Sequence, residues 1–445
     1  MVARAGCAYR RYQKRSQWLR PLGLELAEMS SEQKRLVILG AGTGGTLSAN
    51  RLRKKYKDDQ LRIDIVDQDN EHVYQPGLLF VPFGLAEPDE IVRKRDRQLK
   101  KGIHYHQCPI ESVDIEANTV ALENGTTLAY DVLLVATGTA LLLDETEGMT
   151  GPGWRETVHT FYDMEGATIL AEALDDFESG HLVVNVVDMP IKCPVAPLEF
   201  VFLADWYFTE KGVRDDVRIT YVTPLDGAFT KPTASAALGS LLDDKHIEVV
   251  AEFSTGEVDG ENGKLISWDG REVDFDLAVM IPLHGGAAYV EESPGLGDEL
   301  GFIPTDNATL QSKVKPNIFV IGDAADVPTS KAGSVTHFEG EVLVENIEAF
   351  IDGKPIEHTY DGHANCFIET GFSKALLIDF NYADEPVGGH YPGPVGLPLL
   401  KESRTNHLGK LMFQSFYWHG LLPGRDIPGI GPDMPKLGKK QPVEG

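Results

Sequence analysis

Cysteine is scarce in this chain, which has four cysteines among its 445 residues. None of them belongs to a Cys-x-x-Cys pair, so the spacing typical of structural zinc is missing and no metal site is predicted. Four is also too few for the disulfide framework of a small secreted domain. Any chemistry carried out by cysteine must therefore depend on folding to bring distant thiols together.

Basic residues and long apolar runs are also in short supply. Lys and Arg number 41 against 68 Asp and Glu, which gives a formal net charge of -27. This charge argues against nucleic acid as a partner, because phosphate binding needs a basic surface. No run of 18 apolar residues occurs, so no membrane-spanning helix is predicted. Residues 1–33 lack the apolar core of a secretory signal and are predicted to form a mobile leader.

The first motif present in full is a dinucleotide-binding fingerprint. The apolar run 35–39 leads into Gly40-Ala-Gly-Thr-Gly-Gly45 and then into a helical pattern over 46–55. The three fingerprint glycines allow, in order, a tight turn, close approach of the backbone to a pyrophosphate, and close packing of helix on strand. Asp67 ends the next strand, where it can bind a ribose hydroxyl. The predicted cofactor-binding residues here are Gly40, Gly42, Thr43, Gly44, Gly45 and Asp67.

Two later strands indicate that the dinucleotide is FAD. The apolar strand 130–135 closes in Ala136-Thr137-Gly138, and the strand 317–321 closes in Gly322-Asp323. In this order after the glycine-rich turn, both resemble signatures of two-dinucleotide-fold flavoproteins, in which the second acid lies near the ribityl and phosphate groups of FAD.

The predicted fold class is therefore α/β, with two Rossmann-like dinucleotide-binding domains and a C-terminal membrane-interface region. The FAD-binding domain is expected in two parts, and the predicted boundaries are 34–150 and 291–360 for that domain, 151–290 for the second Rossmann-like domain, and 361–445 for the C-terminal region.

A second GxGxxG, which such flavoproteins use for NAD(P)H, is missing. The matching strand, 181–187, runs instead into the loop Met189-Pro-Ile-Lys-Cys-Pro-Val-Ala-Pro-Leu-Glu-Phe200, which has three prolines and no glycine. Proline has no N–H to donate, so this loop is poorly suited to a pyrophosphate. The loop places Cys193 at a strand-to-helix turn, where such folds hold ligands. Beside Lys192 and a helix N-terminus, its thiol pKa is expected to be lowered; an inert buried cysteine is the alternative.

Four segments together resemble sulfide:quinone oxidoreductases, and the resemblance covers residues 34 to about 440. They are the loop 189–200, Lys331-Ala-Gly-Ser-Val-Thr-His-Phe-Glu339, Asn365-Cys-Phe-Ile-Glu369, and the tail 406–425. The resemblance implies that Cys193 and Cys366 form a disulfide or sulfur-bridged pair beside FAD. Sulfide would attack the bridge to give a persulfide, and two electrons would pass through FAD to a membrane quinone. Cys366 is expected nearer the flavin, with Cys193 as the persulfide carrier, although the split between them is less firmly implied than the pair.

The resemblance also implies roles for other residues. Segment 139–161 lacks the third cysteine that many family members have, so a two-cysteine mechanism and non-covalent FAD are expected. Glu199 is expected to assist acid–base chemistry near the sulfur, and a carboxylate stabilised by the helix dipole is the alternative. The further residues implied are Lys331 and Gly333 at the flavin end of FAD, Phe367 and Phe413 on either side of the quinone ring, and Lys410 as donor to the quinone oxygen or the flavin.

The C-terminal tail reverses the charge of the chain. Residues 401–445 hold seven Lys and Arg against four Asp and Glu, and apolar residues recur at helical spacing at 408, 411, 412, 416 and 421. Such a helix suits an anchor lying in a membrane interface, although a terminal helix that covers the core is the alternative. We therefore predict peripheral, monotopic attachment to the cell membrane. The resemblance further allows a homo-oligomer.

Three other functions remain open on the sequence. A flavoprotein subunit could pass sulfide electrons to a cytochrome, which the basic aromatic tail argues against. A type II NADH:quinone dehydrogenase would need the missing second GxGxxG. A flavin-bearing redox sensor docked on a membrane would bind flavin without turnover.

Overall fold

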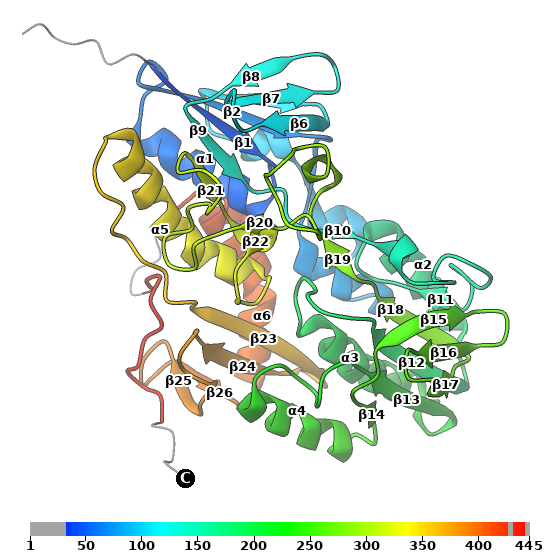
Figure 1. Ribbon diagram of the computed structural model, residues 1–445. Coiled ribbons are helices and arrows are strands. Elements are labelled where there is room, and N and C mark those ends of the chain that lie inside the picture. The colour runs from blue at the N-terminus through cyan, green and yellow to red at the C-terminus, as the bar shows by residue number, and fades with distance from the viewer. Residues whose placement is uncertain (1–32, 426–429, 441–445) are drawn as a thin grey trace, which may run out of the picture. The chain divides into compact units, whose positions relative to one another are not determined.

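The computed structural model describes residues 33–425 and 430–440. The predicted leader therefore lies outside the described residues, except for Gln33. The first sheet is parallel, with strand order β21-β9-β1-β2-β5 (Figure 1). Its strands are β1 (Lys34–Leu39), β2 (Leu61–Asp67), β5 (Ile103–Gln107), β9 (Val132–Val135) and β21 (Ile318–Val320).

Both faces of this sheet are covered, as its continuous apolar strands require. Leu36 and Ile38 of β1 enter a core shared with helices α1 (Thr43–Lys55) and α5 (Gly333–Ile351), which contact each other. Val37 and Leu39 enter a second core, beneath a small antiparallel sheet. The strands of that sheet are β6 (Ile110–Asp114), β7 (Thr119–Leu122) and β8 (Thr127–Ala129). Helix α1 begins at Thr43, inside the glycine-rich turn and three residues before the expected start.

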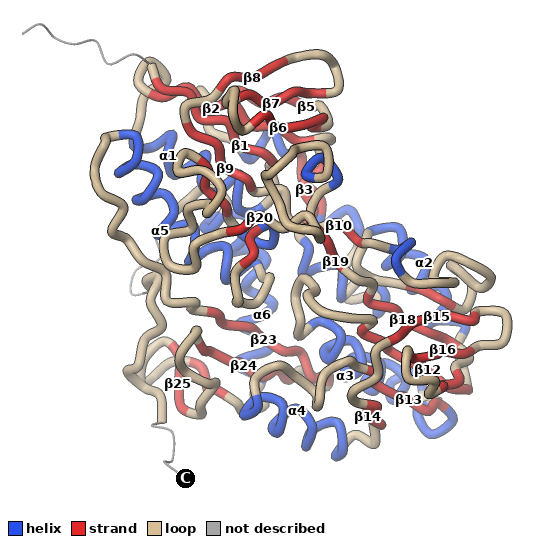
Figure 2. The backbone as a smooth tube through the Cα atoms, in the orientation of Figure 1, coloured by secondary structure: helices blue, strands red, loops and turns tan. Residues whose placement is uncertain are grey.

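The second sheet is also parallel, with strand order β11-β18-β12-β13-β14. Its strands are β11 (Val158–His159), β12 (Gly180–Val186), β13 (Val217–Val222), β14 (Glu248–Val250) and β18 (Leu277–Ile281). Three helices accompany these strands (Figure 2), namely α2 (Met164–Asp176), α3 (Ala196–Lys211) and α4 (Pro232–Asp244). A three-stranded antiparallel sheet packs against this second sheet across a separate hydrophobic core. Its strands are β15 (Thr255–Asp259), β16 (Lys264–Ser267) and β17 (Glu272–Asp274). The predicted α/β fold class with two Rossmann-like units is confirmed.

The C-terminal part forms an antiparallel hairpin with a helix packed on it. Strands β23 (Ala364–Gly371) and β24 (Lys374–Phe380) pair so that Cys366 lies opposite Ile378. Helix α6 (Arg404–Phe416) contacts both strands, and α3 and α5 also contact β23. Strand β23 therefore links both Rossmann-like units to the tail. After α6 the chain continues as a π-helical turn, Tyr417–Leu421.

Short strand pairs complete the structure. They are β3 (Glu71–Val73) with β4 (Val92–Lys94), β10 (Ala140–Leu141) with β19 (His284–Gly285), β20 (Ile303–Pro304) with β22 (Ala325–Asp326), and β25 (Gly389–Tyr391) with β26 (Leu397–Leu399). Across residues 33–425 and 430–440, no helix is both long and apolar enough to cross a bilayer.

Candidate active site

One large cavity collects most of the residues singled out in the sequence. It has a volume of about 980 Å³ and extends from the glycine-rich turn after β1 to β23 and α6. It is lined by all the predicted cofactor, cysteine and quinone residues except Gly45. A Cβ atom at Gly45 would lie 1.9 Å from the Gly40 carbonyl oxygen, so this glycine serves the close packing of α1 on β1, as predicted.

The cavity has open space where a bound dinucleotide would approach the backbone. Gly42, Gly138 and Gly333 line it, and a Cβ atom on any of them would meet no protein atom within 4 Å, so the open space begins at their backbone. Gly42 caps α1 without a side-chain hydrogen bond, and the first N–H groups of α1 are therefore available to an anion. The residues present thus provide a phosphate cradle at the glycine-rich turn.

Asp67 is held against the glycine-rich turn. Its Oδ2 atom accepts a hydrogen bond of 2.7 Å from the Ala41 N–H and lies 3.3 Å from Nη1 of Arg95. Arg95 also donates to the Ala41 carbonyl at 3.1 Å. Burial raises the pKa of Asp67, and Arg95 acts against this rise. Sequence reasoning missed Arg95 because it belongs to no motif and lies 28 positions beyond its partner.

The two cysteines reach the cavity from different units of the fold. Cys193 lies in the turn between β12 and α3, and its N–H donates to the Lys331 carbonyl at 2.6 Å. Its own carbonyl accepts from the Ala196 N–H at 2.9 Å and from the Tyr162 hydroxyl at 3.3 Å. Cys366 lies in β23, and both residues are free thiols. The fold thus gathers at one cavity two cysteines that are 173 positions apart.

The predicted lowering of the Cys193 pKa is wrong. Burial raises the pKa of Cys193 to about 12, and the Glu199 carboxylate adds to the rise while Lys410 opposes it. Burial also raises the pKa of Cys366. Lys192 does not overcome this effect, because it is itself buried, with its pKa lowered, and donates to the Tyr162 carbonyl at 3.2 Å. The surroundings therefore keep both thiols protonated.

A buried ion pair lies beside the cysteines. Glu199, in the first turn of α3, pairs with Nζ of Lys410 from α6 and accepts a 2.6 Å hydrogen bond from the Glu369 N–H. Lys410 also donates to the Phe367 carbonyl at 3.3 Å. Burial raises the pKa of Glu199, although the Lys410 ammonium opposes this rise. Burial would lower the pKa of Lys410, but the Glu199 carboxylate outweighs this effect, so the pKa of Lys410 is raised. Lys410 is therefore held as a cation at the cavity wall.

Aromatic side chains surround the end of the cavity near α6. Phe367 and Phe413 both line it, and the Phe413 ring lies 6.5 Å from the ring of Tyr74. A Cβ atom at Gly409 would lie 3.0 Å from the Phe367 ring, so this glycine lets α6 approach β23 closely. A flat ring could enter here between aromatic surfaces, with Lys410 within reach.

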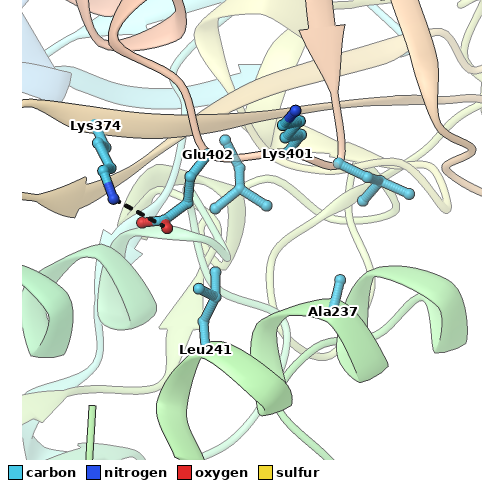
Figure 3. Close-up of a pocket in the computed structure, with 7 residues that line it drawn as sticks. Ala237, Leu241, Lys374, Lys401 and Glu402 are labelled. Atoms are coloured by element: carbon cyan, nitrogen blue, oxygen red, sulfur yellow. Dashed lines mark ion pairs between the residues drawn. The ribbon is translucent and has the colours of Figure 1, made fainter. Parts of the chain in front are cut away.

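Further polar contacts at the cavity had no signal in the sequence. The Tyr417 hydroxyl lies 2.7 Å from Oγ1 of Thr43 and 2.6 Å from Nε2 of His72, which ties the tail to the glycine-rich turn. A smaller cavity of about 350 Å³ lies apart from these groups, between α4 and the hairpin, beside the Lys374–Glu402 ion pair (Figure 3). None of the predicted site residues lines it.

Comparisons with known proteins agree with this geometry. The family model for pyridine nucleotide-disulphide oxidoreductases matches residues 34–184. A mitochondrial sulfide:quinone oxidoreductase of Dictyostelium discoideum is 27% identical over 396 residues, covering 88% of this chain and 86% of its own. The resemblance to sulfide:quinone oxidoreductases is confirmed. The X-ray structure of the Aquifex aeolicus sulfide:quinone oxidoreductase has a TM-score of 0.77 at 20% identity, covering 88% of this chain and 92% of that one. These matches imply a flavin cofactor.

One more distant relative bears on the electron donor. A type II NADH:quinone oxidoreductase of Staphylococcus aureus is 23% identical over 354 residues, covering 74% of this chain and 85% of its own. The loop after β12 bears on whether the electron donor is sulfide or NADH. In this chain the loop holds Cys193 and three prolines in place of a glycine-rich turn.

Proposed function

We propose that this protein is a flavin-dependent sulfide:quinone oxidoreductase that works through a Cys193–Cys366 pair. The observation that carries the proposal is the meeting of the two cysteines in one cavity with the dinucleotide cradle and the buried cation Lys410. The relatives that match almost the whole chain are named for the oxidation of sulfide with a quinone as acceptor.

The cysteines carry the sulfur chemistry. With the pair oxidised to a disulfide, HS⁻ attacks Sγ of Cys193; the S–S bond breaks, a persulfide forms on Cys193, and Cys366 leaves as a thiolate. Lys410 stabilises the new negative charge, because its ammonium acts on both thiols. Loss of two electrons and one proton to the acceptor then joins the Cys193 persulfide to Cys366 in a bridge longer by one sulfur atom, which the next HS⁻ attacks, so the chain lengthens by one sulfur atom per two-electron turnover. Glu199, whose charge acts on the Cys193 thiol, exchanges protons with sulfur species there.

The cofactor we propose is non-covalent FAD. The fold leaves Cys193 and Cys366 as the cysteines at the cavity among the described residues, and disulfide exchange needs both of them free of a flavin bond. When bound, the flavin accepts two electrons from the sulfur centre and delivers them to a quinone. Phe367 and Phe413 would hold the quinone ring, and Lys410 would donate to its oxygen.

The test of this function compares donors and acceptors in steady-state assays of the purified protein. We expect decylubiquinone reduction with sulfide as donor and at most about 1% of that rate with NADH. Cytochrome c in place of quinone should give little reduction, which argues against the flavocytochrome alternative. Flavin binding without turnover on any donor would instead indicate a redox sensor.

We propose that α6 attaches the protein to the membrane surface. Leu408, Leu411 and Met412 are 57%, 51% and 63% exposed, whereas Tyr417 and Trp418 in the following turn are buried. The tail therefore combines the two alternatives suggested by its sequence. The turn at Tyr417 and Trp418 covers the core, whereas α6 presents an apolar face to the outside. Self-association into a homo-oligomer remains a prediction from the resemblance.

Membrane attachment predicts that Leu411→Glu combined with Met412→Glu weakens binding to vesicles at least tenfold. Inserting each apolar side chain contributes about 1.5–3 kcal/mol, and a tenfold change corresponds to about 1.4 kcal/mol. Co-sedimentation with phosphatidylcholine–phosphatidylglycerol vesicles measures the change. Trp268→Glu is the matched control, because Trp268 is 80% exposed and follows β16, away from the tail. Undiminished binding of the double variant would exclude α6 as the contact.

A further inference from the structure

A buried carboxylate outside the steps described so far connects the site with the protein surface. The side chain of Glu369 on β23 is 2% exposed, and both of its oxygens lie 2.9 Å from Nδ1 of His407, which donates to them. The His407 side chain, on α6, is 25% exposed. Burial raises the pKa of Glu369, against the opposing effects of His407 and Lys410. Glu369 therefore takes up a proton more readily than an exposed glutamate.

The backbone of the same residue is joined to the inner ion pair. Oε1 of Glu199 accepts the Glu369 N–H and also pairs with Lys410, so Glu369 and Lys410 are held against one oxygen atom. Lys410 lines the cavity, and its charge acts on the Glu369 carboxylate. Lys410 at the cavity and the Glu369–His407 pair toward the surface are thus electrostatically coupled. In the part of the chain that the structure describes, no hydrogen bond or ion pair joins the Lys410 ammonium to the Glu369 carboxylate, so a proton that passes between them needs a bridging water molecule.

We propose that His407 and Glu369 are the outer part of a proton path that reprotonates Lys410 during quinone reduction. This inference rests on the proposed function, because it concerns the same quinone site. It assigns to Glu369 and His407 a role in proton delivery, while Lys410 remains the group that touches the quinone.

The proton balance explains why such a path is needed. Oxidation of HS⁻ to sulfur releases two electrons and one proton, whereas reduction of a quinone to a quinol takes two of each. One proton per turnover must therefore enter from water. In the proposed sequence an N–H bond of Lys410 breaks as an O–H bond forms on the quinone. Lys410 then regains a proton from the Glu369 carboxyl through a bridging water molecule, Glu369 from the His407 imidazolium, and His407 from bulk water.

The other charged side chains on the neighbouring elements have partners of their own or face water. Glu199 of α3 is held by Lys410, and Glu402 accepts a hydrogen bond of 2.6 Å from the Thr370 hydroxyl. Glu402 also pairs at 3.7 Å with Lys374 of β24. Arg404, on the first turn of α6, is exposed. Within the described residues, the Glu369 carboxylate has no hydrogen bond or ion pair with Glu402, Lys374 or Arg404.

The experiment follows the two half-reactions separately by stopped-flow spectroscopy of the flavin-loaded protein. Glu369→Gln keeps the backbone N–H to Glu199 and an oxygen for His407, but its side chain can no longer carry a proton. We expect sulfide to reduce the flavin within about twofold of the wild-type rate. Reoxidation by decylubiquinone should be about tenfold slower, with a larger solvent deuterium isotope effect. His407→Ala should behave alike and recover when imidazole is added.

Glu402→Gln is the matched control, because it removes a neighbouring carboxylate outside the path and should change neither half-reaction. His407→Ala leaves β23 unchanged, so the proposal can still be tested with this variant if Glu369→Gln fails to fold. Wild-type reoxidation in both path variants, or slower reoxidation with no isotope effect and no rescue by imidazole, would overturn the proposal. A wild-type flavin that sulfide does not reduce would instead refute the proposed function itself.

Discussion

Replacing Cys366 with alanine should abolish reduction of the flavin by sulfide, lowering the rate by at least about 1000-fold, with flavin still bound. The proposed chemistry needs a disulfide for HS⁻ to attack, and one remaining thiol cannot form it. Cys193→Ala should have the same effect for the same reason. Anaerobic stopped-flow absorbance measures the rate, and the visible spectrum reports flavin content.

Cys108→Ala is the control for this prediction. Cys108 is buried between β5 and β6, where its N–H donates to the Asp67 carbonyl at 2.9 Å, and it does not line the cavity. This variant should reduce at the wild-type rate. The same samples test the split of roles: mass spectrometry after a single equivalent of sulfide should find the added sulfur on Cys193. Rapid reduction in either Cys193→Ala or Cys366→Ala would rule out the pair.

Replacing Lys410 with methionine should both destabilise the protein and slow quinone reduction by at least about 100-fold. Lys410 and Glu199 are an ion pair whose side chains are 11% and 2% exposed. Removing one partner of a buried pair leaves an uncompensated charge and typically costs about 3–5 kcal/mol. Quinone reduction should fall because the cation beside the ring is lost. Guanidinium denaturation and quinone-dependent reoxidation measure the two effects.

The double variant Lys410→Met with Glu199→Gln separates the two effects. It removes both charges, so we expect it to recover a large part of the lost unfolding free energy but none of the lost quinone reduction. Lys401→Met is the control, because Lys401 is exposed in the loop just before α6. If the double variant is no more stable than the single variant, the ion pair does not account for the loss.

The cofactor cradle could be predicted because its determinants are local in sequence. Gly40, Gly42 and Gly45 act through the turn in which they lie; Gly40 and Gly42 line the cavity, and a Cβ atom at Gly45 would meet the Gly40 carbonyl oxygen. The cysteine pair was predicted from the resemblance, since nothing between positions 193 and 366 shows that they meet.

The missed features depend on tertiary burial. The thiol pKa of Cys193 was expected to fall because its sequence neighbours suggest a helix N-terminus and a lysine. In the fold, burial and Glu199 outweigh both influences, and the pKa is raised. Arg95 and the Glu369–His407 contact were also missed, because each joins separate elements and neither forms a recurrent motif.

The central claim is that sulfide, acting through the cavity cysteines, reduces the bound flavin. Its most direct test is an anaerobic absorbance titration of the purified protein, with sulfide added to one sample and NADH to another. We expect sulfide alone to bleach the flavin and decylubiquinone then to restore its colour. Bleaching by NADH and not by sulfide would show that sulfide is not the electron donor and that the proline-rich loop 189–200 does accept a nicotinamide dinucleotide.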